Sequence, residues 1–287
     1  MPVSTSVVDL VRSGLRAIQR NPGLLAPVAL GRRQPLPDPA PHWRTIETGP
    51  LAGIQLFLPG RGCGWADSIV CHAAYEAAML PALAELARAG GVLYDVGAHI
   101  GFFSCAWQVL GGDGVEAFEP VPRHQKLLHE TFARNNLGQQ VRLHPAALGH
   151  EDMIAQLRVN QADLGDSSLA YVEGMGGIDW RLRAEAYPDA ETLKIRVRRL
   201  DDVIGELPNP PAVLKIDVEG AEACVIEGAR AVLSRHRPTI LSEVHNVYAG
   251  MQMAESLERL GYRLQLLGKN HWLPACMWVP AEKTHHR

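Results

Sequence analysis

The sequence contains few cysteines, and they are spaced neither as metal ligands nor as a disulfide framework. The five are Cys63, Cys71, Cys105, Cys224 and Cys276, with no C-x-x-C pair among them. An odd number of widely separated cysteines is typical of reduced thiols, and structural zinc requires ligands in closely spaced pairs. We therefore expect a protein of a reducing compartment without a structural zinc site.

The sequence also lacks an excess of charge of one sign and any long apolar run. Its 28 Lys and Arg residues nearly balance 31 Asp and Glu residues, which leaves a formal net charge of −3. That balance provides no electrostatic footprint for nucleic acid. No stretch reaches the roughly 18 apolar residues of a membrane span, and charged residues interrupt the first 20 residues, unlike the apolar core of a signal peptide. We expect a soluble, cytoplasmic protein that acts on a small molecule.

The first 60 residues differ in pattern from the rest of the chain. Apolar residues between 7 and 18 fall on one face of a predicted helix, which would cover the core or a second subunit of a homo-oligomer. A proline-rich arm is predicted over residues 21–41, and a hairpin over 43–58 with its turn at Gly49. We treat residues 1–60 as one unit and 61–287 as the main domain, which opens with a predicted helix over 66–89.

From residue 91 onward the pattern alternates between short apolar strands and helices. Strands are predicted at 92–96, 114–118, 141–143, 212–216 and 239–242, followed by 263–267 and 277–279, and helices at 102–110, 121–136, 221–233 and 254–260. Such alternation indicates an α/β fold with a mostly parallel sheet and helices on both faces. Ligands of these sheets bind beyond the carboxyl ends of the strands, so those ends are the candidate functional positions.

The ends of the first two strands carry a pattern suited to a nucleoside cofactor. The first strand runs into Asp95, Gly97 and Gly101, whose glycines allow a sharp turn and close approach of the backbone to a ligand. This spacing differs from the G-x-G-x-x-G of nicotinamide enzymes, and Asp95 could accept a hydrogen bond from an ammonium group. Glu119 follows the second strand about 20 residues later, the separation at which an acid binds ribose hydroxyls.

The ends of the fourth and fifth strands carry a group of titratable side chains. Asp217, Glu219 and Glu222 follow Lys215 within a few residues, and Glu243 and His245 end the next strand. Charges so close to an apolar strand are costly unless they are paired or functional. Lys215 can pair with one or two of these acids, which leaves others to orient or deprotonate an acceptor.

These motifs together resemble the FkbM family of S-adenosylmethionine-dependent methyltransferases. The resemblance covers residues 91–246 and is most specific at 214–222 (Leu-Lys-Ile-Asp-Val-Glu-Gly-Ala-Glu). It implies a Rossmann-like class I methyltransferase fold with seven strands, which acts on hydroxyl groups of sugars or natural products. It also implies that Asp217 faces the reacting centre. The implied cofactor-binding residues are Asp95, Gly97, Ala98, His99, Gly101, Glu119, Pro120 and Asp217. His99 stands where the family commonly has asparagine.

The predicted reaction is therefore O-methylation of a sugar or natural-product hydroxyl. The candidate catalytic residues are Asp217, Glu219, Glu243 and His245; any of the last three could be the base that takes the hydroxyl proton. No metal ligand is assigned, although Asp217, Glu219 and Glu243 could share a divalent cation in a metal-assisted version of the reaction. A nicotinamide-dependent oxidoreductase on a related sheet and a non-catalytic binding protein are the rival interpretations.

The stretch between the third and fourth main strands is the least regular part of the predicted domain. Residues 160–191 contain several glycines beside the predicted site, which favours a lid or a wall for the acceptor. The alternative is a solvent loop, with an extra strand at 154–159.

Overall fold

The computed structural model describes residues 40–59, 76–159, 170–175, 190–270 and 273–281. The predicted N-terminal helix, almost all of the proline-rich arm and most of the predicted lid lie outside the described residues. The same is true of the first part of the helix predicted over 66–89, whose described part is α3 (Leu80–Arg88). Within the described residues, no helix combines the length and apolar character needed to cross a membrane.

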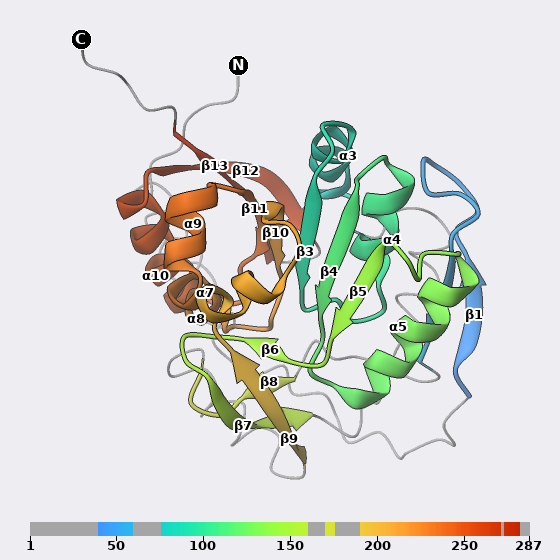
Figure 1. Ribbon diagram of the computed structural model, residues 1–287, viewed down its shortest axis with the longest axis horizontal. Helices are drawn as coiled ribbons and strands as arrows, with labels where there is room; N and C mark the ends of the chain where they lie inside the picture. Colours follow the sequence, from blue (N-terminus) through green and yellow to red (C-terminus); the bar gives the residue numbers. More distant parts are fainter. Residues whose placement is uncertain (1–39, 60–75, 160–169, 176–189, 271–272, 282–287) are drawn as a thin grey trace, which may run out of the picture.

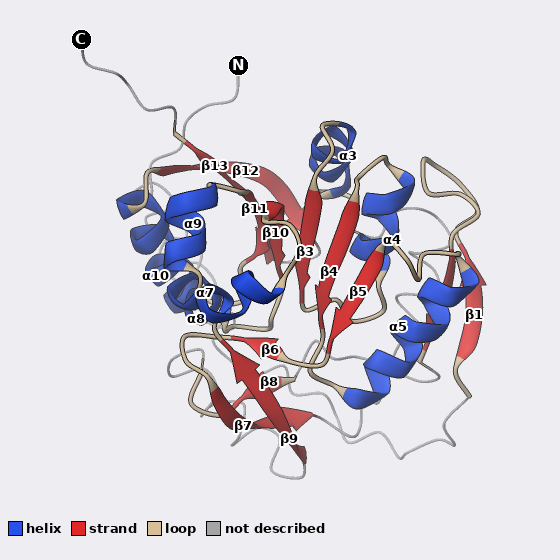
Figure 2. Cartoon of the chain, in the orientation of Figure 1, coloured by secondary structure: helices blue, strands red, loops and turns tan. Residues whose placement is uncertain are grey.

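A seven-stranded sheet forms the centre of the molecule (Figures 1 and 2). Its strands are β3 (Val92–Val96), β4 (Gly114–Phe118), β5 (Val141–His144), β10 (Pro211–Ile216), β11 (Thr239–Glu243), β12 (Tyr262–Asn270) and β13 (Leu273–Pro280). Their order across the sheet is β12-β13-β11-β10-β3-β4-β5. The pairs from β11 to β5 are parallel, whereas β13 runs antiparallel to both of its neighbours. The predicted fold class, a mostly parallel seven-stranded Rossmann-like sheet, is confirmed.

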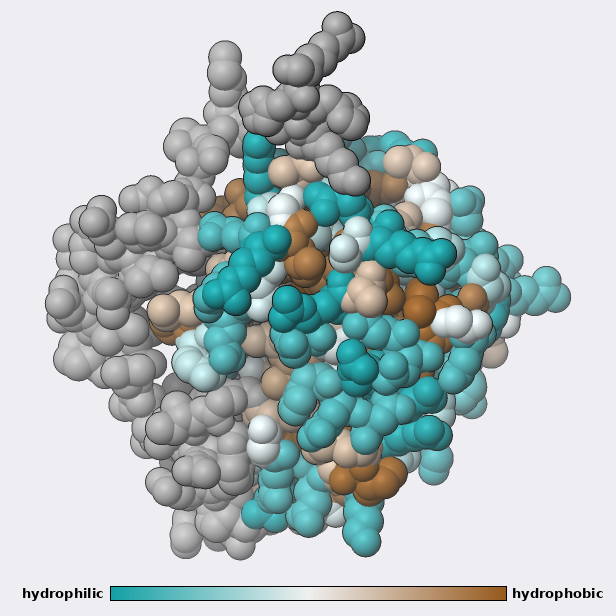
Figure 3. Space-filling view, turned by 60° about the vertical axis from the view of Figure 1, so that its left-hand side comes forward, coloured by the Kyte–Doolittle hydropathy of each residue, from teal (hydrophilic) through white to brown (hydrophobic). Residues whose placement is uncertain are grey.

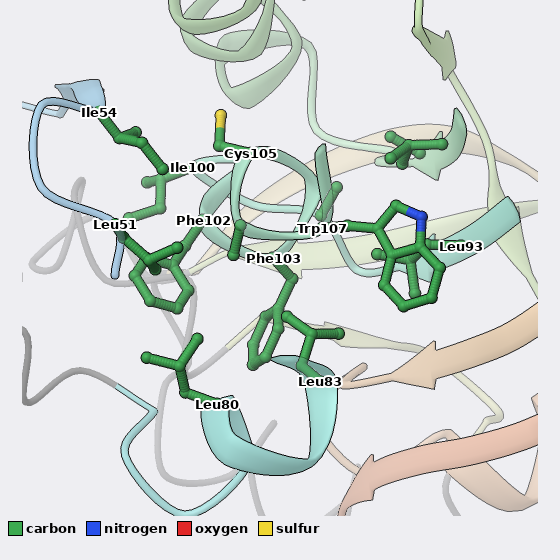
Figure 4. Close-up of a cluster of buried hydrophobic side chains, with 14 of the residues drawn as sticks. Leu51, Ile54, Leu80, Leu83, Leu93, Ile100, Phe102, Phe103, Cys105 and Trp107 are labelled. Carbon is green, nitrogen blue, oxygen red and sulfur yellow. The ribbon is translucent and has the colours of Figure 1, made fainter. Parts of the chain in front are cut away.

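Helices cover both faces of this sheet, as the alternation of strands and helices predicted (Figure 2). One face carries α3, α4 (Phe102–Val109) and α5 (Pro122–Arg134), and the other carries α7 (Leu200–Val203), α8 (Glu222–Gly228), α9 (Arg230–His236) and α10 (Val247–Arg259), with the short 3-10 helix η4 (Ile204–Glu206) after α7. Successive side chains of a strand point to opposite faces. Leu93 of β3 therefore packs in the core of the first face with Phe103 and Trp107 (Figure 4), while its neighbour Tyr94 packs in the core of the second.

The predicted hairpin is confirmed as β1 (His42–Thr45) paired antiparallel with β2 (Gln55–Leu58). It lies against α5. The backbone N–H of Gln55 donates to Asn135 Oδ1 at 2.9 Å, and that of Phe57 donates to Thr131 Oγ1 at 3.0 Å. Leu56 and Leu58 are buried in the same core as α4. These contacts hold β2 on α5 through both polar and apolar groups.

Two predicted helices differ from those observed. The single helix predicted over 221–233 is two helices, α8 and α9, which meet at Ala229 in a non-helical conformation (φ −114°, ψ 7°). The helix predicted over 254–260 is only the second half of α10, which begins after Asn246, whose side chain accepts a hydrogen bond from the Ala249 N–H at 2.7 Å. An asparagine in that role is a common helix N-cap, and it is the sequence signal for the earlier start.

A second, four-stranded sheet lies beside the carboxyl ends of the main strands and is drawn below them in Figure 1. It consists of β6 (Ala147–Leu148), β7 (Met153–Val159), β8 (Tyr171–Val172) and β9 (Glu191–Arg198), in the order β6-β9-β7-β8. The extra strand predicted at 154–159 is confirmed as β7. Strand β9 was not predicted, although Leu193, Ile195 and Val197 alternate with polar residues at the period of a half-buried strand.

The apolar face of this second sheet supports two loops of the main sheet. Its core includes Val121, which follows Glu119, and Ala221, which follows the 217–220 loop, and Val218 packs against it. The loops that contain the predicted cofactor and acceptor residues therefore rest on the same small core.

The described surface on the side shown in Figure 3 is mostly hydrophilic, with small and separate hydrophobic patches. Among the described residues, the large hydrophobic side chains that are exposed are Val109, Ile154, Val247, Tyr248, Met251 and Leu266. Val247, Tyr248 and Met251 lie together at the start of α10, whereas Val109, Ile154 and Leu266 come from separate elements.

The end of α8 allows a direct test of the packing. A Cβ atom added at Gly228 would lie 1.8 Å from the backbone oxygen of Gly149. We expect Gly228→Ala to lower the free energy of unfolding by about 1–3 kcal/mol, as overpacking does, despite the higher helix propensity of alanine. Urea unfolding followed by circular dichroism measures the change. Gly205→Ala is the matched control, because its Cβ would have no neighbour within 4 Å. Equal stability of the two variants would contradict this close contact.

Candidate functional site

Backbone hydrogen bonds bring together the carboxyl ends of β3, β4 and β10. The N–H groups of Gly97 and Ala98 both donate to the carbonyl of Phe118, at 3.0 and 3.1 Å, and the Asp217 N–H donates to the carbonyl of Val96 at 3.1 Å. Gly97 has a φ of +80°, and a Cβ atom there would lie 1.9 Å from the Asp217 carbonyl oxygen. Only glycine fits this position, because the two loops touch through their backbones.

Gly101 serves a packing role at the other end of the same loop. It has a φ of +84° and precedes α4 as its N-cap residue. A Cβ atom at this position would lie 2.9 Å from a methyl carbon of Leu128 and 3.0 Å from the ring of Phe132, both on α5. The second predicted cofactor glycine therefore lets α4 begin close to α5.

Glu119 joins the two loops that sequence analysis assigned to the cofactor. Its Oε2 accepts the backbone N–H of His99 at 2.9 Å, and its Oε1 accepts that of Val121 at 2.9 Å. His124 Nδ1 lies 3.4 Å from the same Oε1. Burial opposes ionisation here, but the contact with His124 and the hydrogen bond from Val121 outweigh it and lower the pKa of Glu119. Glu119 is thus a buried carboxylate held beside residues 97–101, and Pro120 leads from it into α5.

His99 lies close to this carboxylate with a neutral ring. Its backbone is left-handed, with a φ of +49°, and its ring meets that of His124 edge-on at 4.8 Å between centroids. Burial first, and then the neighbouring His124, lowers the pKa of His99 to about 3. Its Nε2 is buried and has no hydrogen-bond partner in the described part of the chain. His124 was not predicted from the sequence, since nothing marks it apart from its place in the first turn of α5.

Asp95 and Lys215 form a buried ion pair beneath the loop. Asp95 accepts a hydrogen bond from Ser104 Oγ at 2.7 Å, and Lys215 Nζ lies 3.4 Å from its other oxygen. Lys215 Nζ also donates to the Gly97 carbonyl at 2.9 Å and lies 3.3 Å from Asp217 Oδ2. Burial disfavours the charged ammonium, but Asp217 and Asp95 outweigh that effect and raise the pKa of Lys215. The predicted pairing of Lys215 is confirmed, with Asp95 as a second partner.

The acids at the ends of β10 and β11 surround His245. We call Asp217, Glu219, Glu222 and Glu243 the acid cluster. His245 Nδ1 lies 2.6 Å from Glu222 Oε1, whereas Nε2 lies 3.5 Å from Asp217, 3.5 Å from Glu219 and 3.7 Å from Glu243. Burial disfavours the charged ring, but Glu219 and Glu222 outweigh it and raise the pKa of His245 well above its usual value. A raised pKa favours the charged ring, so it favours the neighbouring carboxylates over His245 as the base.

Asp217 connects the acid cluster to Lys215. One carboxylate oxygen faces Lys215 Nζ and the other faces His245 Nε2. Burial opposes ionisation, but these two neighbours lower the pKa of Asp217. All four predicted catalytic residues therefore lie together, and their sheet order places them on the β10–β11 side of the residues at the ends of β3 and β4. Three of them, Asp217, Glu243 and His245, offer atoms that could hold a metal ion.

Comparison with known proteins gives one family match and two relatives that align with part of this chain. The family profile described as the Methyltransferase FkbM domain matches residues 95–264. Methyltransferase 1 of Beauveria bassiana is 31% identical over 144 residues, which are 47% of this chain and 57% of that protein. The AMB antimetabolite synthetase AmbE of Pseudomonas aeruginosa is 35% identical over 128 residues, which are 42% of this chain and 6% of that protein. The chain thus spans a little over half of the first relative and a small part of the second.

Solved structures also resemble the chain. The FkbM methyltransferase of Methylobacillus flagellatus KT superposes with a TM-score of 0.47 at 19% identity, covering 66% of this chain and 43% of that one. The precorrin-6y C5,15-methyltransferase of Geobacter metallireducens GS-15 gives a TM-score of 0.43 at 13% identity, with 71% and 87% covered.

Proposed function

The chain belongs to the FkbM methyltransferase family, and we propose that it transfers a methyl group from S-adenosylmethionine to a hydroxyl group of a sugar or natural product. The observation that carries this proposal is the position of Glu119. Its carboxylate lies at the end of β4 and accepts the His99 N–H from the glycine loop after β3. A buried acid held against a glycine loop at this edge is the arrangement that binds the ribose of a nucleoside cofactor.

The residues around Glu119 fit S-adenosylmethionine. Gly97 and Gly101 hold left-handed backbone, which lets the chain turn sharply between β3 and α4. The buried and unpartnered Nε2 of His99 offers a polar contact beside them. We propose that Glu119 binds the ribose hydroxyls and that Gly97, Ala98, His99, Gly101 and Pro120 line the cofactor. Asp95 would position the loop through Lys215, and Asp217 would face the cofactor on the acceptor side.

When bound, the cofactor supplies a methyl group on positively charged sulfur, which is the electrophile. The protein then has to align the acceptor oxygen with that methyl group, and such positioning contributes on the order of 7–11 kcal/mol to lowering the barrier. We propose that Glu219 takes the hydroxyl proton. Its side chain is 19% exposed, against 9% for Glu243, and the raised pKa of His245 disfavours that ring as the base.

Binding of the cofactor can be tested on Glu119 directly. We expect Glu119→Gln to weaken S-adenosylmethionine binding about 10- to 100-fold, because a hydrogen bond to a charged group contributes about 1.5–3 kcal/mol. Isothermal titration calorimetry measures the affinity. Glu130→Gln is the matched control, since Glu130 is exposed on α5, and it should bind like the wild type.

The same titration, together with an assay of methyl transfer, distinguishes the proposed methyltransferase from an oxidoreductase and from a non-catalytic binding protein. Uptake of a nicotinamide dinucleotide and not of S-adenosylmethionine by the folded wild type would favour the oxidoreductase and contradict the proposal. Cofactor uptake followed by transfer of a labelled methyl group to a member of a panel of glycosides and polyketides would exclude a non-catalytic binding protein.

Two of the described cysteines are held as unreactive thiols. Cys105 and Cys276 are buried, and neither forms a disulfide. Burial raises the pKa of Cys276 to about 12 and that of Cys105 still further, so both stay protonated and unreactive.

A further inference from the structure

The geometry around His245 points to a metal site that the methyltransferase assignment does not include. Asp217, Glu243 and His245 each offer one ligand atom, and these three atoms lie within 4.8 Å of one another. We propose that the three side chains bind a divalent cation of the Mg²⁺ or Mn²⁺ class. The role of the cation in the reaction rests on the proposed function. The binding of the cation to the three side chains does not.

The two distances from His245 to the other proposed ligands fit a coordination shell better than hydrogen bonds. Nε2 of His245 lies 3.5 Å from Asp217 Oδ1 and 3.7 Å from Glu243 Oε2. Ligands about 2.1–2.3 Å from one cation lie about 3.0–3.8 Å apart when they are neighbours in an octahedral or tetrahedral shell. An N–H···O hydrogen bond is normally 2.7–3.2 Å long. One N–H group also cannot serve several carboxylates at once.

The second ring nitrogen of His245 is held as in a metal-binding histidine. Nδ1 lies 2.6 Å from Oε1 of Glu222, a side chain that is fully buried, and the same oxygen accepts the Gly220 N–H at 2.9 Å. The His245 side chain is itself only 5% exposed, and Nε2 points into the acid cluster without a hydrogen bond of ordinary length. Ligating histidines typically donate their other N–H to a carboxylate, which fixes the ring and leaves the remaining nitrogen for the metal. A bound cation would displace the Nε2 proton, since a histidine ligates in its neutral form.

The position of this site assigns a role to the cation. Asp217 ends β10 and Glu243 ends β11, whereas Glu119 follows β4, and β3 lies between β10 and β4. Strands are about 4.8 Å apart, so the cation would lie about 10–15 Å from Glu119, beyond the ribose and on the acceptor side. Three protein ligands leave further coordination positions for oxygen atoms of the acceptor. The favoured acceptor class therefore carries a second oxygen next to the hydroxyl that is methylated.

The hydroxyl proton passes to the Glu219 carboxylate, the acceptor oxygen forms its bond to the methyl carbon, and the carbon–sulfur bond breaks with its electron pair left on sulfur. The products are the methyl ether, protonated Glu219 and S-adenosylhomocysteine. The cation is unchanged at the end of the reaction.

Manganese binding tests the proposal without any acceptor. The full chain is freed of metal with a chelator, and Mn²⁺ uptake is followed by electron paramagnetic resonance. We expect one Mn²⁺ per chain and at least 10-fold weaker binding in Glu243→Gln and His245→Gln. Glu222→Gln alters the support of His245 without removing a proposed ligand, and it should weaken binding about 10- to 100-fold. Glu227→Gln, on the exposed side of α8, is the control and should bind as the wild type does.

A second measurement uses the wild type alone, in case a variant fails to fold. Bound Mn²⁺ should broaden the nuclear magnetic resonance signals of the His245 ring and leave those of His129, exposed on α5, unchanged. No uptake by the wild type, or uptake that Glu243→Gln, His245→Gln and Glu222→Gln do not weaken, would overturn the metal site. Methyl transfer that persists in chelator with no Mn²⁺ uptake would leave the proposed function standing, whereas Mn²⁺ uptake without cofactor uptake would leave only the metal site.

Discussion

Replacing Lys215 with methionine should lower the free energy of unfolding by about 3–5 kcal/mol, the usual result of removing one partner from a buried ion pair. The side chain is only 2% exposed, and its ammonium group contacts Asp95, Asp217 and the Gly97 carbonyl. Without it, Asp95 remains a fully buried carboxylate that has lost the cation with which it pairs in the described part of the chain. Domains are commonly stable by about 5–15 kcal/mol, so the loss is a large part of the total. Urea unfolding followed by circular dichroism measures it.

Two further variants separate the charge effect from the loss of a side chain. Lys126→Met, on the exposed side of α5, should change stability by less than about 0.5 kcal/mol. The double variant Asp95→Leu with Lys215→Met should regain much of the lost stability, because a buried pair replaced by apolar groups is often neutral. A Lys215→Met protein with a stability close to that of the wild type would show that the ion pair is solvated.

Replacing Glu219 with glutamine should lower turnover about 10²- to 10⁴-fold, which is the usual contribution of a general base. The change keeps the shape of the side chain and removes its ability to take the hydroxyl proton. Turnover is measured with methyl-labelled S-adenosylmethionine and an acceptor from the glycoside and polyketide panel that the wild type methylates. Affinity for the cofactor should be unchanged, because Glu219 lies on the β10–β11 side of the site. Unaltered turnover would remove Glu219 from the base role.

The backbone conformation of Glu219 allows a second variant, Glu219→Gly, in which stability and turnover should change in different directions. Its φ is +59°, a left-handed conformation that costs a residue other than glycine about 1–3 kcal/mol. Glu219→Gly should therefore match or exceed the wild type in stability while losing turnover. Asn136→Gly is the matched control: Asn136 also has a positive φ, of +57°, but lies after α5, so this variant should keep full turnover. Loss of turnover in both variants would point to a general effect of glycine.

The sequence was sufficient to predict the main sheet and the position of the site. Four of the five parallel strands, β3, β4, β10 and β11, end at an acid or a glycine, and parallel pairing brings these ends to one edge. Asp95, Glu119, Asp217 and Glu243 were found in this way. Only the general rule was needed, since the carboxyl ends of parallel strands lie at the same edge of the sheet.

Contacts between different elements could not be predicted in the same way. Glu222 and His245 are 23 residues apart and meet only because α8 begins beside the end of β11. The contact between His124 and Glu119 depends on the angle at which α5 leaves β4. Short polar contacts of this kind depend on helix placement to within about an ångström, and hydrophobic periodicity does not encode that placement.

Strand β9 and the break between α8 and α9 were missed for different reasons. The alternation of Leu193, Ile195 and Val197 was present in the sequence but lay far from any motif. The break at Ala229 has no local signal, because Gly228 is a weak helix breaker on its own. The break becomes understandable only when the close contact between Gly228 and Gly149 is known.

The small core of the second sheet has a consequence for how this protein can be altered. The residues that pack in this core or against it include Val121, Val218 and Ala221. The loops of Glu119 and Glu219 are therefore supported by the same core, although they follow different strands. A substitution at Leu157 or Ile195, distant from both carboxylates along the chain, will tilt the two loops jointly. Searches for variants with a changed acceptor range should therefore include the core of the second sheet. Adding or removing one methyl group there should shift the loops of Glu119 and Glu219 together.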